Sequence, residues 1–162
     1  MNLNELLIPA RVLANAKAES RKRALEVLSQ LLSKDQPELS QADVMRSLVA
    51  RERLGSTAIG GGMAVPHGRV AGIEQAVGAL IRLNEPVDYS ADDNMPVDLM
   101  FAMLVPQECS QAHAELVSRA ALHLSDPEIC RCMRAAKTSK ALYECFEDPA
   151  ENIRDLRAGL QA

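Results

Sequence analysis

The feature that most constrains the fold is an unbroken apolar run, Leu99–Val105, which is seven residues long. Seven residues are far too few to cross a bilayer as a helix. A short apolar run without alternation fits a central strand that is covered on both faces. A second segment, from Val77 to Leu83, has apolar residues at every other position and fits a half-buried strand. The two segments together predict a β-sheet that needs helices to cover it.

Helical patterns occur on both sides of these strands in the sequence. Apolar residues between Ala24 and Leu32 follow the i, i+3, i+4, i+7 spacing of an amphipathic helix. Ser40 followed by Asp43 resembles a capping box and predicts a helix that ends near residue 53. Asp126 and Pro127 are the residue types that favour a helix cap and first turn. Further helices are expected at about 110–124 and 139–146 and, weakly, near the C-terminus at Ile153, Leu156 and Leu160, with short strands at 11–14 and 63–65.

These elements predict one α/β domain over residues 1–162, a mixed β-sheet flanked by helices. A chain of 162 residues is typical of a single domain and is long enough to bury a core without metal or disulfide support. The sequence has no internal repeat and no segment with the composition of an interdomain linker.

Composition excludes several function classes. The formal net charge is −4, so the chain has no overall attraction for nucleic acid or for an anionic membrane. Four aromatic residues are too few for the stacking platforms that bind single-stranded nucleic acid. The N-terminus does not have the basic and apolar regions of a signal peptide. We therefore expect a cytoplasmic protein with no membrane insertion and no nucleic-acid partner.

The cysteines, at positions 109, 130, 132 and 145, are expected to be free thiols, as is usual in the cytosol. Cys130 and Cys132 lie two positions apart on a predicted helix, so their side chains point about 200° apart and cannot converge on one zinc ion. We expect no metal and no cofactor.

A loop of small residues, Gly55–Gly62, suggests phosphate binding but matches neither nucleotide template. Gly55 and Gly60 have the spacing of a P-loop, but Gly61 and Gly62 stand where Lys and Ser or Thr are required. A dinucleotide-binding loop follows a strand and precedes a helix, and here that order is reversed. Neither motif is present.

His67 has the most distinctive setting of the three histidines. Pro66 restricts its own φ and forces Val65 to be extended, so His67 stands at a rigid strand end. Gly68 permits the close approach of another molecule. These features suit a histidine that carries an anion, although a histidine in such a turn also fits a purely structural role.

The residues around this histidine resemble a known family. Residues 51–57, Gly60 and Met63–Gly68 are similar to the active-site signature of phosphotransferase-system IIA domains of the mannitol/fructose type. The similarity continues through residues 96–99 and 104–106 to His113 and covers about residues 5–147, which leaves a tail at 148–162 that we expect to be helical. Residues 20–26, 57–60 and 129–136 are similar to the nitrogen-regulatory branch of this family.

The resemblance implies an assignment for each site residue. His67 would accept the phosphoryl group, His113 would be the second active-site histidine, and Arg51 would bind the phosphoryl oxygens. Thr57 would contribute a hydroxyl group, and backbone N–H groups of Gly60, Gly61 and Gly62 would complete a phosphate cradle. Without the resemblance, His113 also fits a half-buried structural histidine and Arg51 a solvated cation at a helix end.

The implied function is that of a regulatory phosphocarrier rather than an enzyme with independent turnover. Its phosphoryl group would come from an HPr-like carrier, NPr, which is charged by an enzyme I homologue with phosphoenolpyruvate. Its targets would be sensor kinases or potassium-transport proteins. The alternative is a sugar-specific IIA component that passes phosphate to a IIB domain. The basic segment Arg21–Arg23 fits either a docking patch or a solvated helix face.

Overall fold

Strand β6 (Val97–Pro106) is the centre of a six-stranded mixed sheet, as its apolar run predicts. The computed structural model describes residues 3–108 and 110–147. Strand β5 (Val77–Val87) pairs with β6 in the antiparallel sense, and β1 (Val12–Ala16) pairs with β5 in the parallel sense. On its other edge, β6 pairs in parallel with β3 (Met63–Ala64) and β4 (His67–Val70). Strand β2 (Ala58–Gly60) is antiparallel to β3.

The break between β3 and β4 fixes the position of His67. Met63 and Ala64 pair with Leu99 and Met100, and His67 pairs with Met103 further along the same edge of β6. Pro66 lies between the two segments and has no N–H to donate to the ladder. Its carbonyl oxygen accepts a hydrogen bond from the backbone N–H of Met103, with an N···O distance of 2.9 Å. His67 is therefore the first residue of a strand that is anchored directly to the central one.

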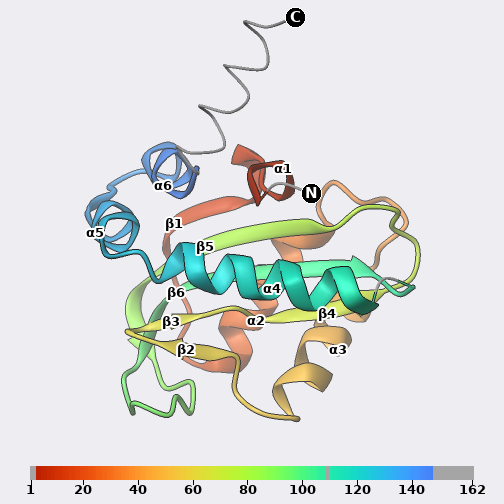
Figure 1. Cartoon of the computed structure of the whole chain (residues 1–162), viewed down its shortest axis with the longest axis horizontal. Helices are drawn as coiled ribbons and strands as arrows, with labels where there is room; N and C mark the ends of the chain where they lie inside the picture. Colours follow the sequence, from red (N-terminus) through yellow and green to blue (C-terminus); the bar gives the residue numbers. More distant parts are fainter. Residues whose placement is uncertain (1–2, 109, 148–162) are drawn as a thin grey trace, which may run out of the picture.

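Helices cover both faces of the sheet, with α4 (Ser110–Leu124) in front and α2 (Arg21–Ser33) behind it in Figure 1. Alternate residues of β6 divide between two cores. Leu99, Phe101 and Met103 pack in the core that α4 covers, and Met100 and Ala102 pack in the core that α2 covers. The front layer also contains α1 (Leu3–Leu6), α5 (Pro127–Ala135) and α6 (Ser139–Phe146). On the other face, α3 (Gln41–Glu52) lies beside α2. A short 3-10 helix, η1, spans Pro9–Arg11.

The predicted helix caps are confirmed. Ser40 caps α3 by accepting a hydrogen bond from Asp43 N at 3.0 Å. Asp126 caps α5 by accepting hydrogen bonds from the backbone N–H groups of Glu128 and Ile129. The helix at 139–146 is also present, with Thr138 as its cap. Capping depends on a few adjacent residues, which is why the sequence predicts it well.

One local expectation was wrong, and one strand was missed. Residues 55–62 are not entirely a loop, because Ala58–Gly60 form β2 and pair with β3. The strand β4 was not expected, since the residues after Pro66 show no apolar alternation. The tail helix expected at 148–162 lies outside the described residues.

None of the helices within residues 3–108 and 110–147 is long and apolar enough to cross a membrane.

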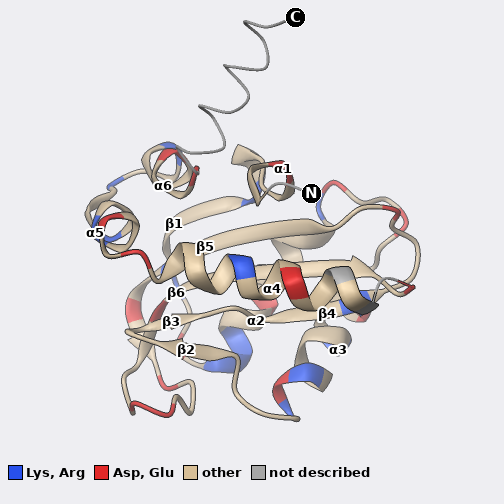
Figure 2. Ribbon diagram, viewed as in Figure 1, with Lys and Arg blue, Asp and Glu red and all other residues tan. Residues whose placement is uncertain are grey.

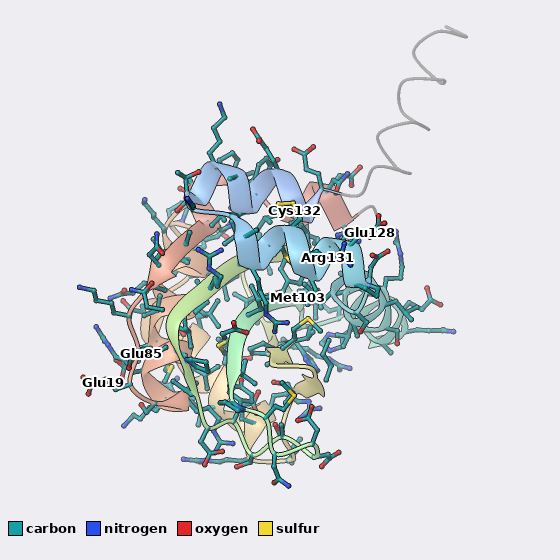
Figure 3. The ribbon with its side chains drawn as sticks, turned by 90° about the vertical axis from the view of Figure 1, so that its left-hand side faces the viewer. Glu19, Glu85, Met103, Glu128, Arg131 and Cys132 are labelled. Carbon is teal, nitrogen blue, oxygen red and sulfur yellow. A yellow bond between two sulfur atoms is a disulfide. The ribbon has the colours of Figure 1, made fainter. Side chains whose placement is uncertain are left out.

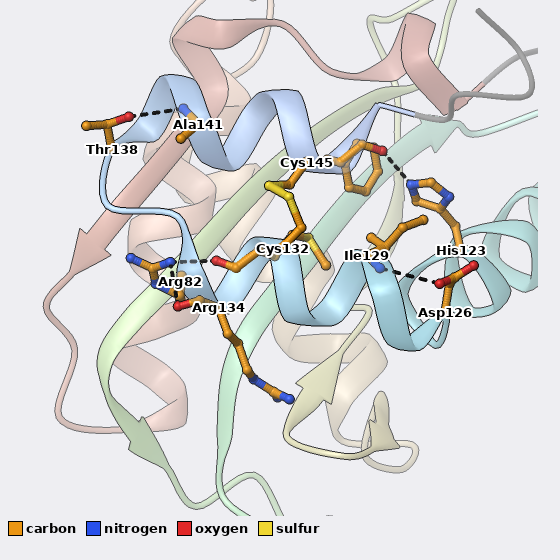
Figure 4. Close-up of a disulfide and its surroundings, with 11 residues drawn as sticks. Arg82, His123, Asp126, Ile129, Cys132, Arg134, Thr138, Ala141 and Cys145 are labelled. Carbon is orange, nitrogen blue, oxygen red and sulfur yellow. Dashed lines mark hydrogen bonds between the residues drawn. A yellow bond between two sulfur atoms is a disulfide. The ribbon is translucent and has the colours of Figure 1, made fainter. Parts of the chain in front are cut away.

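The expectation of free thiols was also wrong for two cysteines. Cys132 on α5 and Cys145 on α6 form a disulfide, with their Cα atoms 5.6 Å apart (Figures 3 and 4). The two helices pack side by side, which brings together residues 13 positions apart in sequence. Cys130 is a free thiol that lies near Leu124 O and Met63 Sδ instead. The pairing follows from how α5 and α6 pack, which the spacing of the cysteines does not reveal.

Candidate functional site

The ring of His67 is held at both nitrogens. Its Nδ1 lies 2.8 Å from the carbonyl oxygen of Val65, and its Nε2 lies 3.2 Å from Nε of Arg51. A carbonyl oxygen can only accept a hydrogen bond and an arginine nitrogen can only donate one. The proton of a neutral ring therefore sits on Nδ1, and the lone pair of Nε2 accepts the hydrogen bond from Nε of Arg51.

Burial keeps this imidazole neutral. The side chain is 9% exposed, and desolvation is the largest cause that lowers the pKa of His67 below its usual value. The hydrogen bond to Val65 opposes this shift, the charge of Arg51 adds to it, and the charge of Glu52 opposes it. The lowered pKa favours the uncharged ring at neutral pH, and the unprotonated nitrogen of a neutral imidazole is a nucleophile.

His113, on α4, lies next to His67. The two ring centroids are 5.1 Å apart with the ring planes 61° apart. Burial, followed by the charges of His67, Arg69 and Arg51, lowers the pKa of His113. Its Nδ1 is buried and has no hydrogen-bond partner among the described residues. Unpaired buried polar atoms are uncommon in native proteins and often mark a functional site.

Both histidines border an open cavity of about 680 Å³ between α3, β4 and the start of α4. Arg46, Arg51 and Arg69 line it together with His67 and His113. Asp43 is the carboxylate among the lining residues, and its Oδ1 lies 2.7 Å from Nη1 of Arg46. Figure 2 shows basic segments of α2 and α3 on the lower side of the molecule in that view. The cavity has the charge and donor groups to hold an anion.

Gly68 permits α3 to pack closely against β4. A Cβ atom at this position would overlap the side chain of Ser47 on α3. Ser47 Oγ instead donates to the carbonyl oxygen of Arg69 at 2.9 Å. The glycine thus lets α3, which carries Arg51, lie directly against the strand that carries His67.

The other expected phosphate-binding residues lie elsewhere. Thr57 is 6% exposed and bonds to Glu52 and Tyr89. Gly60, Gly61 and Gly62 all have positive φ; Gly60 ends β2, and Gly61 and Gly62 form the turn to β3. The N–H of Gly61 already donates to Asp93 Oδ2 at 2.9 Å, and its carbonyl accepts from Arg134. Within the described residues, the structure brings His67, His113 and Arg51 together on the cavity and places Thr57 and the glycines off it.

Sequence reasoning did not find Arg46, Arg69 or Glu52. Residues two apart on a strand share a face, but β4 was not predicted, so the spacing of His67 and Arg69 did not indicate a shared site. Glu52 directly follows Arg51, but nothing local indicates that its carboxylate is buried. Within the described residues, no group of three His, Cys, Asp or Glu side chains is arranged to hold a metal ion.

Comparison with known proteins gives consistent relatives. Residues 5–148 match the family described as phosphoenolpyruvate-dependent sugar phosphotransferase system, EIIA 2. The chain is 38% identical to the nitrogen regulatory protein of Pseudomonas aeruginosa over 148 residues, 91% of this chain and 96% of that protein. It is 42% identical to the nitrogen regulatory protein of Escherichia coli K12 over 131 residues, 80% of each chain. The crystal structure of the nitrogen regulatory protein IIA-Ntr from Neisseria meningitidis superposes with a TM-score of 0.83 at 37% identity, covering 90% of this chain and 99% of that one.

Proposed function

The chain belongs to the phosphotransferase-system EIIA 2 family, and from this premise we propose that it is a cytoplasmic regulatory phosphocarrier of a nitrogen phosphotransferase system. It accepts a phosphoryl group on His67 from the HPr-like carrier NPr, and its phosphorylation state controls which proteins it binds. The observation that carries the proposal is the unprotonated Nε2 of His67, which accepts a hydrogen bond from Arg51 at the edge of a cationic cavity.

The transfer step follows from the geometry of the ring. The lone pair of Nε2 forms a bond to phosphorus, while the bond between phosphorus and the donor atom of the carrier breaks and leaves its electron pair on that atom. The ring then has a formal positive charge, which the hydrogen bond from Nδ1 to Val65 O stabilises. Arg51, Arg69 and the neighbouring imidazole of His113 offer positive charge and donors to the phosphoryl oxygens.

Regulation follows from the charge that the phosphoryl group adds. Phosphorylation brings about −1.5 to −2 charges to one point of the surface, beside three arginines. Such a change alters which partner surfaces fit the cavity rim, where Leu54 is 84% exposed. Sensor kinases and potassium-transport proteins are the proposed targets. The relatives named as nitrogen regulatory proteins favour this role over sugar uptake.

The proposal is tested by incubating the purified protein with phosphoenolpyruvate, the enzyme I homologue and NPr, followed by intact-mass analysis. We expect one acid-labile phosphoryl group on the wild type, none on His67→Ala, and slower phosphorylation of His113→Gln. If the wild type stays unmodified while NPr is phosphorylated, the proposed function is wrong. Rapid transfer onward to a purified sugar-specific IIB domain would instead favour the role of a sugar-transport IIA component.

A further inference from the structure

Glu52 is a buried carboxylate beside the site that the transfer chemistry does not use. It is the last residue of α3, directly follows Arg51, and is 7% exposed. Burying a charged group without partners is very unfavourable. A carboxylate at this position therefore needs a compensating arrangement around it.

That arrangement consists of three donors. Thr57 donates to the Glu52 carboxylate through its backbone N–H, at 3.2 Å, and through its hydroxyl group. The hydroxyl group of Tyr89, a fully buried side chain, donates to Oε1 at 2.8 Å. All three partners donate, which is the arrangement that an ionised carboxylate requires. The phenol is held protonated, because burial, reinforced by the charge of Glu52, raises the pKa of Tyr89 far above its usual value.

The hydrogen bonds of Glu52 fix the loop that follows α3, and this loop in turn holds the side chain of Arg51. The loop from residue 53 to Thr57 leaves α3 and is tied back to its last turn by Glu52. The carbonyl oxygen of Gly55, in this loop, accepts a hydrogen bond from Nη1 of Arg51 at 2.8 Å. The guanidinium of Arg51 is thus fixed on one side by the loop and on the other by Nε2 of His67.

Glu52 brings a negative charge to a region in which arginines predominate. The charged and titratable groups around His67 are Asp43, Arg46, Arg51 and Glu52 from α3, Arg69 from β4 and His113 from α4. On the other side of the network, the guanidinium of Arg21 lies 5.7 Å from the ring centre of Tyr89. Asp43 is exposed and paired with Arg46, whereas Glu52 is a buried carboxylate, and its charge opposes the effect of Arg51 on His67.

We propose that Glu52 is a positioning residue for phosphoryl transfer: its carboxylate, bound by Thr57 and Tyr89, holds the loop that aims Arg51 at His67 and sets a negative charge against the cations around the site. This role rests on the proposed function for its effect on transfer. Its effect on the His67 ring does not depend on any phosphoryl donor.

The test separates charge from hydrogen bonding. Glu52→Gln removes the charge and keeps the shape of the side chain, Tyr89→Phe removes one donor and keeps the charge, and the exposed Glu38→Gln serves as a control for loss of a surface carboxylate. The titration midpoint of the His67 imidazole is measured by NMR on the unphosphorylated protein, and the rate of phosphorylation by NPr is measured as a function of pH.

We expect Glu52→Gln to lower the His67 midpoint and to slow phosphorylation roughly ten- to a hundredfold, as is typical when a positioning contact is lost. Tyr89→Phe slows phosphorylation and leaves the midpoint in place, and Glu38→Gln changes neither. A wild-type midpoint in Glu52→Gln overturns the proposal, and so does a wild-type rate in both Glu52→Gln and Tyr89→Phe. If the wild type accepts no phosphoryl group, the proposed function fails and the midpoints alone decide the role of Glu52.

Discussion

Arg51 holds the loop after α3 through Nη1 and His67 through Nε, so one side chain joins two parts of the site. The contact to Nε2 of His67 covers the lone pair that the proposed transfer uses. A phosphoryl group on this nitrogen would displace the Nε–H of Arg51 toward the phosphoryl oxygens, where a planar guanidinium can bond two of them. The residue therefore suits both the empty and the phosphorylated site.

Replacing Arg51 by lysine tests this dual contact. An ammonium group has no fixed fork and cannot reach the Gly55 carbonyl and His67 in the same geometry. We expect Arg51→Lys to slow phosphorylation by NPr roughly ten- to a hundredfold. Arg53→Lys, an exposed neighbour that does not line the cavity, is the matched control and should retain the wild-type rate. Equal rates for the two variants would show that only the charge at position 51 matters.

At the scale of single residues, the family signature predicts His67, His113 and Arg51 as site residues, and the structure brings the three together. It placed Thr57 with the phosphate, whereas the structure places Thr57 in the network of Glu52 and Tyr89. Tyr89 lies 37 positions from Glu52 in sequence, so no local pattern connects them. Whether a polar side chain faces a cavity or a buried partner depends on packing, which its neighbours in sequence do not encode.

At the scale of helices and strands, periodicity and capping predicted the elements that have strong local signals. The apolar run became β6, and Ser40 and Asp126 cap helices as expected. The short strands β2 and β4 were missed because their pairing, with β3 and β6 respectively, is what makes them strands. A segment of three or four residues has too little periodicity to be recognised alone.

The disulfide between α5 and α6 should contribute measurably to stability. A cross-link across a loop of this length stabilises a protein by about 3 kcal/mol, mainly by restricting the unfolded chain. We expect the double variant Cys132→Ser/Cys145→Ser to lose about this amount in denaturant unfolding. Reduction with dithiothreitol should destabilise the wild type and leave the double variant unchanged.

Cys130→Ser is the matched control, because it removes a thiol from α5 and keeps the disulfide. It should retain most of the wild-type stability and should still respond to reduction. An insensitive wild type would mean that α5 and α6 are held by their packing alone.

At the scale of the whole molecule, two cores on opposite faces of one sheet meet at β6, and the site lies where β4 and α3 pack against its edge. Burial favours the neutral form of both histidines, and this makes the free energy of unfolding depend on pH. Their pKa values are lowered in the folded protein, so between those values and about 6.5 the unfolded chain binds more protons. Stability contributed by the neutral rings is therefore lost as the pH falls below about 6.5.

We expect the free energy of unfolding to decrease from pH 7.5 to pH 5.5 in the wild type. The decrease should be smaller in His67→Gln/His113→Gln, which has no titrating group at these positions. Denaturant unfolding at both pH values gives the two differences. An identical decrease in the double variant would mean that other groups cause the pH dependence.

The sequence by itself determined the fold class, the central strand, the main helices and their caps, and it led to the prediction of His67, His113 and Arg51 as site residues. These properties depend on periodicity, on capping within one helical turn, or on a contiguous motif, all of which are local. Only the tertiary structure decided that Arg51 meets Nε2 of His67, that Thr57 turns toward Glu52 and Tyr89, that the glycine turn lies off the cavity, and that Cys132 pairs with Cys145. Each of these is a contact set by how elements pack, and packing depends on the shapes of side chains from the whole chain at once.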